Sequence, residues 1–401
     1  MSDATRGAAP DAGAPGSVAG APESFAGAPE SVAGAPKPSA GRRWAKAFWQ
    51  RAAPVVYGLI AGGILLLLMG KNPVAFYWTT LESGLLTWSG LMQTIIRLAP
   101  LLLMSAGFIV AFQAGLWNIG GDGQFLLAAA VVAGLGAPAL GVMPFWLVLP
   151  LLCVVGFLVG GAWTVVPSLM KAYYGMNEII TTLMMAFIGI NLANILIKGP
   201  FLSHETLVPQ TDVIPFVYLL WYIPGTHIHV GIVIALVALA LVHFMQTRTS
   251  YGLRLRILGA SPRAALHAGI SVKRDIVTAF ALSGGLIGLA AAVEVLGVWG
   301  YVRADWNPAF GMTLFAIVFL AGLDVLVVIP FVFFFAVIQI GGHEAARQAG
   351  LPNDFLLVLI GLILFFMVLT EWARTRGWLG RLRGRYAGSV AAAPEEAVGD
   401  G

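Results

Sequence analysis

The sequence predicts an all-α polytopic membrane protein with about ten transmembrane helices, a broken helix near Gly115–Gln124 and both termini in the cytoplasm. Of its 401 residues, 59% are hydrophobic and only 10% are charged, and the mean hydropathy is +0.86. A soluble domain carries about 25% charged residues. Apolar runs recur along the chain at the length that crosses a bilayer, about 20 residues. These observations exclude a soluble globular protein.

The first 40 residues differ from the rest of the chain. Residues 1–40 repeat units such as Val-Ala-Gly-Ala-Pro-Glu-Ser and contain few large apolar side chains. This Gly/Ala/Pro-rich tail is predicted to be disordered, and it lacks the basic start and apolar core of a secretory signal peptide. The transmembrane domain is predicted over residues 41–375. A basic and then flexible tail follows over residues 376–401.

Eight apolar runs are each long enough for one crossing, and a ninth run is long enough for two. The eight lie near residues 54–70, 98–117, 124–142, 144–167, 178–197, 228–247, 276–299 and 353–372. The run 310–340 is predicted to form two helices with a turn near Gly322–Asp324. Residues 213–223 are too short to span and are placed in an outer loop. The total is ten crossings.

Basic residues orient these helices. With ten helices and both termini inside, 18 of the 23 lysines and arginines fall on the cytoplasmic side. An odd number of helices would place one basic terminus outside. The helix count and the positive-inside bias therefore agree.

The stretch from Gln113 to Leu127 is too polar and too rich in glycine for an ordinary transmembrane helix. A helix broken inside lipid frees backbone groups that each cost several kcal/mol, so such breaks line cavities. The helix that restarts near Gln124 would direct its positive N-terminal end at the gap. We expect Asn118, Asp122 and Gln124 to line a substrate path. For Asp122 alone, a water-exposed helix end fits equally well.

The longest basic loop, Thr249–Arg274, has the pattern of a short capped helix. Ser261 can cap this helix, Pro262 suits its first position, and Gly269 can end it in the left-handed conformation. A short helix held below the membrane can transmit motion as a rigid body. The alternative is a basic loop that only satisfies the positive-inside bias.

Glu294 is a charged residue inside the apolar run 276–299. A charge that faces lipid costs roughly 2.5–3.5 kcal/mol, so Glu294 should face the bundle interior or the outer vestibule. Substrate contact and a structural hydrogen bond are equally open to it. Gly284, Gly288 and Ala292 on the same run form a predicted close-packing face. The polar residues Asn191, Asn194 and Gln339 are expected to form interhelical hydrogen bonds.

The break resembles the Gly-Leu-Phe-Asn-Ile-Gly-x-Glu-Gly-Gln signature of permease subunits of ATP-binding-cassette importers for nucleosides and simple sugars, which are similar to branched-chain amino acid and ribose permeases. The matching residues are Gly115, Leu116, Asn118, Ile119, Gly120, Gly123 and Gln124. Trp117 replaces Phe and Asp122 replaces Glu. The shorter carboxylate changes the placement of the charge in this motif.

Two further stretches carry the resemblance. The basic loop is similar to the segment that docks into the ATPase in that family, and the residues assigned to ATPase coupling are Gly252, Arg254, Arg256, Gly259, Pro262, Ala264, Ala265 and Gly269. The block Gly175–Thr182 resembles the family's Gly-x-Asn-Glu-Val-Ile-x-Thr. It assigns Asn177 and Glu178 to gating or to capping of the next helix.

The resemblance implies a transport subunit with no catalytic residue and no ATPase site of its own. No Gly-x-x-x-x-Gly-Lys-Ser/Thr motif occurs, so ATP would be used by a partner ATPase and this chain would bind no cofactor. The other implied partners are a second homologous permease in a heterodimer and an extracytoplasmic substrate-binding lipoprotein. The chain would lie in the lipid bilayer of a bacterial cell membrane, with no metal site and no nucleic acid partner.

Two other functions are less well supported by the residues. An ion- or proton-driven secondary transporter would need a titratable pair at mid-membrane, for which Asp122 and Glu294 are the candidates. A membrane-embedded enzyme would need a His, Cys or carboxylate cluster, which the sequence does not provide. The sequence leaves open which nucleoside or sugar is carried.

Overall fold

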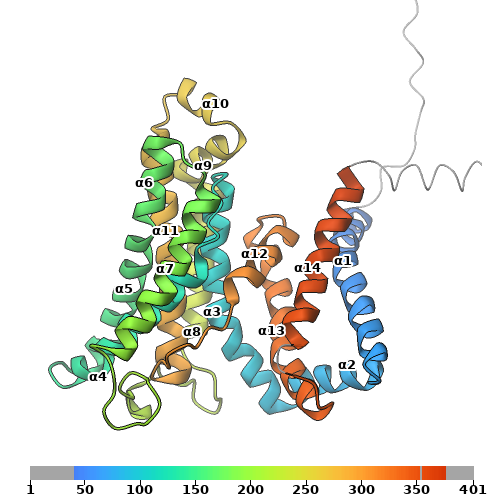
Figure 1. The fold of residues 1–401 in the computed structure, drawn as a ribbon. Coiled ribbons are helices and arrows are strands. Elements are labelled where there is room, and N and C mark those ends of the chain that lie inside the picture. The colour runs from blue at the N-terminus through green and yellow to red at the C-terminus, as the bar shows by residue number, and fades with distance from the viewer. Residues whose placement is uncertain (1–39, 353–354, 376–401) are drawn as a thin grey trace, which may run out of the picture. The chain divides into compact units, whose positions relative to one another are not determined.

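The computed structural model describes residues 40–352 and 355–375, which are built from helices and loops (Figure 1). In these two ranges there is no β-strand, only isolated bridges between Gln210 and Arg303 and between Tyr222 and His229. The described residues belong to two units, which are divided between Ala47 and Phe48. The predicted N-terminal tail, except Ala40, and the predicted C-terminal tail lie outside the described residues.

The helices are α1 (Ala40–Leu68), α2 (Pro73–Leu81), the π-helix η1 (Glu82–Leu86), α3 (Trp88–Gln113), α4 (Gly121–Leu140), α5 (Phe145–Trp163), α6 (Val165–Tyr174), α7 (Glu178–Lys198), the 3-10 helix η2 (Phe216–Tyr218), α8 (Gly231–Arg248), α9 (Ser250–Ala260), α10 (Pro262–His267), α11 (Val272–Glu294), the π-helix η3 (Val295–Trp299), α12 (Phe310–Leu320), α13 (Val325–Gln348) and α14 (Phe355–Thr375). The predicted all-α class is confirmed.

Seven helical segments of the described chain are long and apolar enough to cross a membrane. They are Trp88–Gln113, Gly121–Leu140, Phe145–Tyr174, Glu178–Lys198, Gly231–Arg248, Val272–Trp299 and Val325–Gln348. Three shorter apolar helices cover Ala53–Leu68, Phe310–Leu320 and Phe355–Thr370. Each predicted apolar run therefore contains a helix. Among the described residues, seven helical segments have the length and composition of a crossing, and the count of ten stays a prediction.

Several predicted boundaries are wrong. Helix α3 begins at Trp88, ten residues before the predicted start, because Thr87 accepts a hydrogen bond from the Gly90 amide and caps it. It ends at Gln113 because Gly115 has a positive φ of 71°. Helix α4 then begins at Gly121, earlier than the expected restart near Gln124. Helix α2 and η1 were not predicted.

The turn between α12 and α13 confirms the predicted split. Gly322 and Leu323 both have positive φ, and the Asp324 side chain accepts hydrogen bonds from the first amides of α13. Helix α12 has only 11 residues. It is therefore about 16 Å long and cannot by itself cross a hydrocarbon core of about 30 Å.

Glycines bring α5 and α11 into direct backbone contact. A Cβ atom added to Gly284 or Gly288 of α11 would overlap the carbonyl oxygen of Gly160 or Gly156 of α5. The predicted close-packing face on this helix is therefore confirmed. Most of α11 is buried, and it also packs on α3 and α4. This helix lies at the centre of the main hydrophobic core.

A second hydrophobic cluster forms where α1, α2, α13 and α14 meet. Leu66 of α1 packs with Phe76 of α2 and with Leu359 of α14. The Phe76 ring contacts Phe355 edge-on, with ring centroids 5.5 Å apart. This cluster packs α14 against α2. The residues around the helix break belong to the main core instead.

Candidate functional site

The non-helical segment between α3 and α4 starts at the end of α3 and runs back alongside it, so that α4 begins level with the middle of α3. The backbone leaves α3 after Gln113, runs without helical structure from Ala114 to Gly120, and starts α4 at Gly121. Gly121 lies against Met104 and Phe108 of α3, because an added Cβ would be 2.9 and 2.6 Å from their terminal side-chain carbons. Met104 is about 14 Å along α3 from Gln113. The start of α4 therefore lies at depth, as predicted.

Two buried side-chain amides stabilise the conformation of the break by hydrogen-bonding to each other. Asn118 Nδ2 donates to Gln124 Oε1 at 3.1 Å, and Gln124 Nε2 donates back to Asn118 Oδ1 at 2.8 Å. Asn118 Nδ2 also donates to Ser283 Oγ of α11 at 3.0 Å. Both amide side chains are buried. The structure thus brings together two of the predicted path residues, and in this conformation they satisfy each other.

Asp122 caps a second helix rather than facing open water. Its Oδ1 accepts a hydrogen bond of 2.6 Å from the backbone amide of Gly311, in the first turn of α12. An added Cβ at Gly311 would lie 2.8 Å from this oxygen, so a larger residue would displace the carboxylate. The positive N-terminal ends of α4 and α12 converge on one carboxylate at mid-depth. Such half-helix ends are typical of solute sites in transporters.

Glu294 pairs with a residue that the sequence analysis did not single out. Its Oε1 lies 2.6 Å from Arg97 Nη1 of α3 and accepts a 2.9 Å hydrogen bond from Trp299 Nε1. The Glu294 side chain is fully buried, whereas the Arg97 side chain is 19% exposed. Arg97 directly precedes the predicted apolar run 98–117, and its partner is 197 residues away.

Aromatic rings and the first turn of α12 lie between the two carboxylates. The Arg97 guanidinium lies over the Phe310 ring, 5.4 Å from its centroid, and Phe310 directly precedes the Gly311 amide that Asp122 binds. Phe310 contacts Phe125 of α4 edge-on, and Phe125 also packs on Trp306. The first turn of α12 therefore separates Asp122 from Glu294, and each carboxylate has its own partner.

The predicted helix in the basic loop is confirmed as α10, which lies at one end of the helices in Figure 1. The Ser261 side chain accepts a hydrogen bond from the Ala264 amide, Pro262 occupies the first position, and Gly269 has a φ of 73°. Ala265 is fully buried, whereas Ala264 is exposed. The exposed side of this six-residue helix therefore carries the small side chain of Ala264 and is accessible to a partner.

Both arginines assigned to coupling bind groups of this same chain. Arg254 lies 3.4 Å from Asp275 of α11, whose side chain is almost fully buried. Arg256 donates a 2.7 Å hydrogen bond to the backbone oxygen of Gln246, in the last turns of α8. Gly252 packs against the same turn of α8. These residues fix α9 to the transmembrane helices on either side of it.

The broken helix and α9 touch each other. Gly115 lies against Gly259, so an added Cβ at Gly115 would be 3.0 Å from the Gly259 Cα. An added Cβ at Gly259 would overlap the carbonyl oxygen of Gln113. These glycines belong to two motifs that are about 140 residues apart in the sequence. Only glycine at both positions allows this close backbone contact.

Asn177 and Glu178 build the start of α7, which also borders the break. The Asn177 side chain accepts a 2.9 Å hydrogen bond from the Ile179 amide, as expected for a cap. Glu178 lies 2.7 Å from Lys171 of α6. Thr182, one turn on, accepts a hydrogen bond from the Ile119 amide of the break. The observed contacts are those of a cap and of a clip between α6 and α7.

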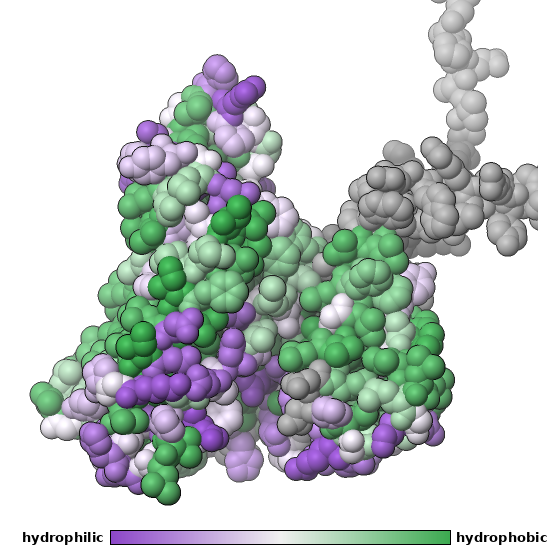
Figure 2. Space-filling view, viewed as in Figure 1, coloured by the Kyte–Doolittle hydropathy of each residue, from purple (hydrophilic) through white to green (hydrophobic). Residues whose placement is uncertain are grey.

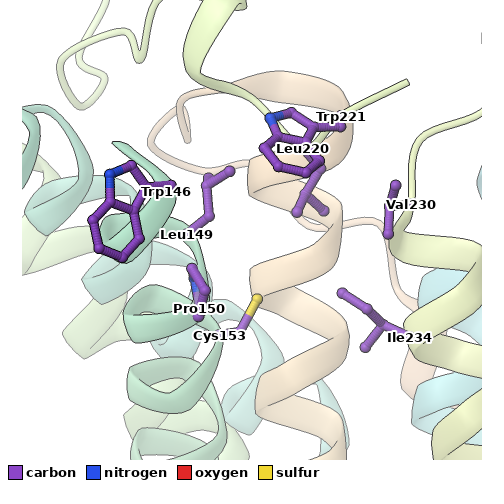
Figure 3. Close-up of a pocket in the computed structure, with 8 residues that line it drawn as sticks. All are labelled: Trp146, Leu149, Pro150, Cys153, Leu220, Trp221, Val230 and Ile234. Atoms are coloured by element: carbon purple, nitrogen blue, oxygen red, sulfur yellow. The ribbon is translucent and has the colours of Figure 1, made fainter. Parts of the chain in front are cut away.

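One groove on the described part of the chain is lined by none of these residues (Figure 3). It has a volume of about 360 Å³ and is lined by Trp146, Leu149, Pro150, Cys153, Leu220, Trp221, Val230 and Ile234. The lining is almost entirely apolar, so the groove suits an apolar group better than a polar solute. In the part of the chain that the structure describes, no three His, Cys, Asp or Glu residues form a group that could hold a metal ion.

Comparison with known proteins adds a family match. The model of the family described as "Branched-chain amino acid transport system / permease component" matches residues 90–368. The chain is 28% identical over 345 residues to the glucose ABC transporter permease protein TsgB13 of Haloferax volcanii, covering 82% of this chain and 90% of that protein. It is 27% identical over 324 residues to the guanosine ABC transporter permease protein NupP of Bacillus subtilis, covering 78% and 90%. The nucleoside ABC transporter permease protein NupB of Lactococcus lactis is 26% identical over 325 residues, covering 79% of this chain and 89% of NupB.

Proposed function

The chain belongs to the family of permease components of branched-chain amino acid transport systems, and on this premise we propose that it carries a nucleoside or a related sugar through the membrane. It is an integral membrane protein and the permease subunit of an ATP-binding-cassette importer. The relatives are named for guanosine, nucleosides and glucose, which supports this class of solute.

Transport is driven by other subunits. A separate ATPase uses the ATP, an extracytoplasmic binding lipoprotein delivers the solute, and a second homologous permease completes a heterodimer. This chain binds no cofactor and provides only the gated path. Family membership supports an ATPase partner and a substrate-binding protein.

The proposed topology has ten crossings in a bacterial cell membrane, with both termini in the cytoplasm. The seven long helices account for seven crossings, and the shorter helices α1, α12 and α14 account for three. In the crossing that contains α12, the loop 300–309 supplies the outer half. The basic residues of the loop Thr249–Arg274 support a cytoplasmic position for α10.

The observation that carries the proposal is the contact between Gly115 and Gly259. This contact packs α9 directly against the break that follows Gln113. The short helix α10 follows α9 in the chain and is connected to the break through it. A shift of α10 caused by a partner would therefore move the break. The path residues Asn118, Asp122 and Gln124 follow within a few residues, with Glu294 beyond the first turn of α12.

Ala264 gives the sharpest test because its side chain is exposed on α10. In cells that carry the complete importer, Ala264→Glu should abolish ATP-driven uptake of labelled guanosine while the chain still inserts in the membrane. The matched control Ala264→Ser should transport normally. A charge at Ala265 would instead disturb folding, because this residue is buried. Normal uptake by Ala264→Glu, with normal ATPase association, would contradict the docking role.

The geometry argues against a proton-driven secondary transporter. Asp122 binds the Gly311 amide and Glu294 binds Arg97, so the two carboxylates do not form a shared titratable pair. Uptake should therefore stop when ATP is depleted and should persist when an uncoupler collapses the proton gradient at constant ATP. The opposite pattern would favour the secondary transporter.

A further inference from the structure

One side of α7 carries polar groups where a membrane-spanning helix should be apolar. Its exposed residues Met184, Ile188 and Ile195 suit lipid, but Asn191 and Lys198 are also exposed. Asn194 lies between them, so these three polar residues follow one line along the outer half of the helix. Figure 2 shows a hydrophilic area within the hydrophobic surface over this part of α7.

The loop 300–309 continues this polar line. Asp305 pairs with Lys198, with the ammonium nitrogen 2.8 Å from the carboxylate oxygen, and the Asp305 amide donates a 2.8 Å hydrogen bond to Asn194 Oδ1. Asn307 accepts a hydrogen bond from the Ala309 amide at 2.9 Å. We call Asn191, Asn194, Lys198, Asp305 and Asn307 the outer polar strip. The expected interhelical role of Asn194 is thus replaced by a bond to a loop.

The loop is held in a strained shape by these contacts. Asp305 and Ala309 have positive φ values of 62° and 51°, which are rare for residues other than glycine. Strained backbone persists only where surrounding contacts fix it, and it concentrates at functional sites. Here the contacts come from Asn194 and Lys198 of α7. The loop then leads into α12, whose first turn lies beside Asp122 at mid-depth.

Lipid cannot be the neighbour of this strip. Asn191 is seven residues, or about 10 Å, from Lys198 at the outer end of α7. Polar side chains at such depth face the bundle interior or a water-filled cavity. Loops at membrane depth are likewise found only where they are buried in protein or line such a cavity. The helix and the loop therefore point independently to an aqueous space at this face.

Free hydrogen-bonding groups remain on the strip. Asn191 Nδ2 donates to the Phe187 carbonyl oxygen of its own helix, and among the described residues nothing donates to its Oδ1. The Nδ2 group of Asn307 has no acceptor within the same residues. The Lys198 and Asp305 side chains are 48% and 70% exposed despite their pairing. Amide, ammonium and carboxylate groups together supply the donors and acceptors that adjacent hydroxyl groups need.

We propose that the outer polar strip lines the outer half of the translocation path and binds the hydroxyl groups of the solute, an inference that rests on the proposed function. Trp306, next to Asp305, packs edge-on against Trp299, which is also partly exposed. Their indole rings provide an apolar surface beside the strip. A solute with a polyhydroxylated ring on one side and an apolar face on the other fits this arrangement.

Cysteine labelling tests whether the strip faces water. The chain has a single cysteine, Cys153, so Cys153→Ala gives a background without thiols. ATP-driven guanosine uptake by this background tests the proposed function separately. In the assembled importer, a membrane-impermeant thiol reagent added outside should label Asn191→Cys, and guanosine should slow the reaction. The control Leu241→Cys, on the exposed apolar face of α8 and 63% exposed, should stay unlabelled.

Absence of labelling at Asn191→Cys in an importer that transports guanosine would overturn the proposal. Labelling that appears only when the second permease is missing would also overturn it, because the strip would then be a subunit contact.

Kinetics test whether the strip binds hydroxyl groups. Asn191→Leu should raise the KM for guanosine about tenfold, as expected for one lost hydrogen bond, and leave the maximal rate unchanged. Asn191→Gln should restore most of the affinity, and Ile195→Leu should have no effect. The Asn191→Leu variant should also discriminate less between guanosine and a deoxyguanosine that lacks the bound hydroxyl group. An unchanged KM in Asn191→Leu, or a fall in maximal rate alone, would overturn the proposed contact.

Discussion

The ion pair between Arg97 and Glu294 allows a quantitative test of how the outer half of the bundle is stabilised. Arginine stays protonated in proteins, so replacing Glu294 leaves a cation without its partner, and replacing Arg97 leaves an anion. Removing one partner of a buried pair costs about 3–5 kcal/mol, whereas replacing both is often close to neutral. The two single variants should therefore not destabilise the fold equally.

The difference follows from burial. Glu294 is fully buried and would keep only its hydrogen bond from Trp299, so Arg97→Gln should cost about 5 kcal/mol, the upper end of that range. The Arg97 side chain is 19% exposed and lies over Phe310, so Glu294→Gln should cost about 3 kcal/mol. The double variant should lose less than either single variant.

Unfolding of the purified chain in mixed micelles, measured for the wild type, both single variants and the double variant, gives the coupling energy directly. The single variants together lose about 8 kcal/mol and the double variant less than about 3 kcal/mol, so we expect a coupling energy of at least about 5 kcal/mol. The exposed pair Glu344–Arg347 is the control, and Arg347→Gln should cost less than about 1 kcal/mol. Additive effects at Arg97 and Glu294, or a larger loss in Glu294→Gln than in Arg97→Gln, would refute the reasoning.

Three other predictions follow from backbone contacts. Gly259→Val should overlap the Gln113 carbonyl oxygen, cost about 1–3 kcal/mol and reduce ATP-driven uptake in an inserted chain; full uptake would disprove the contact. Asp122→Ala should lose the cap on Gly311 and about 0.5–2 kcal/mol in the same unfolding assay, with Asp122→Asn losing less; equal losses would count against capping. Asp324→Ala should lose about 1 kcal/mol at the start of α13 without altering guanosine uptake, since this residue caps an exposed turn.

Local signals predicted the local structure well. Ser261, Pro262 and Gly269 identified α10, and its cap forms as expected because capping depends on neighbouring backbone groups only. The break after Gln113 was also predicted from its glycines. The start of α3 was misplaced because Thr87, rather than an apolar boundary, sets it.

Contacts between distant residues could not be predicted in this way. Nothing near Asp122 in the sequence indicates that its partner is the Gly311 amide, 189 residues later. The sequence showed Glu294 to be costly in lipid but did not identify Arg97 as its partner, because α3 and α11 meet only through the tertiary fold. Asn191 was expected to bond another helix, yet its amide bonds its own helix, since no other helix covers that side.

Helix α11 joins the regions that the sequence motifs treat separately. Its first turn carries Asp275, which binds Arg254 of α9. Ser283, two turns on, accepts a hydrogen bond from Asn118 of the break, and Glu294 at its end binds Arg97. A continuous helix that packs through backbone contacts on α5 moves as one body, because its interior hydrogen bonds fix its length. Any displacement of α9 by a partner that is transmitted to α11 must therefore change the contact at the break and the contact at the outer ion pair together.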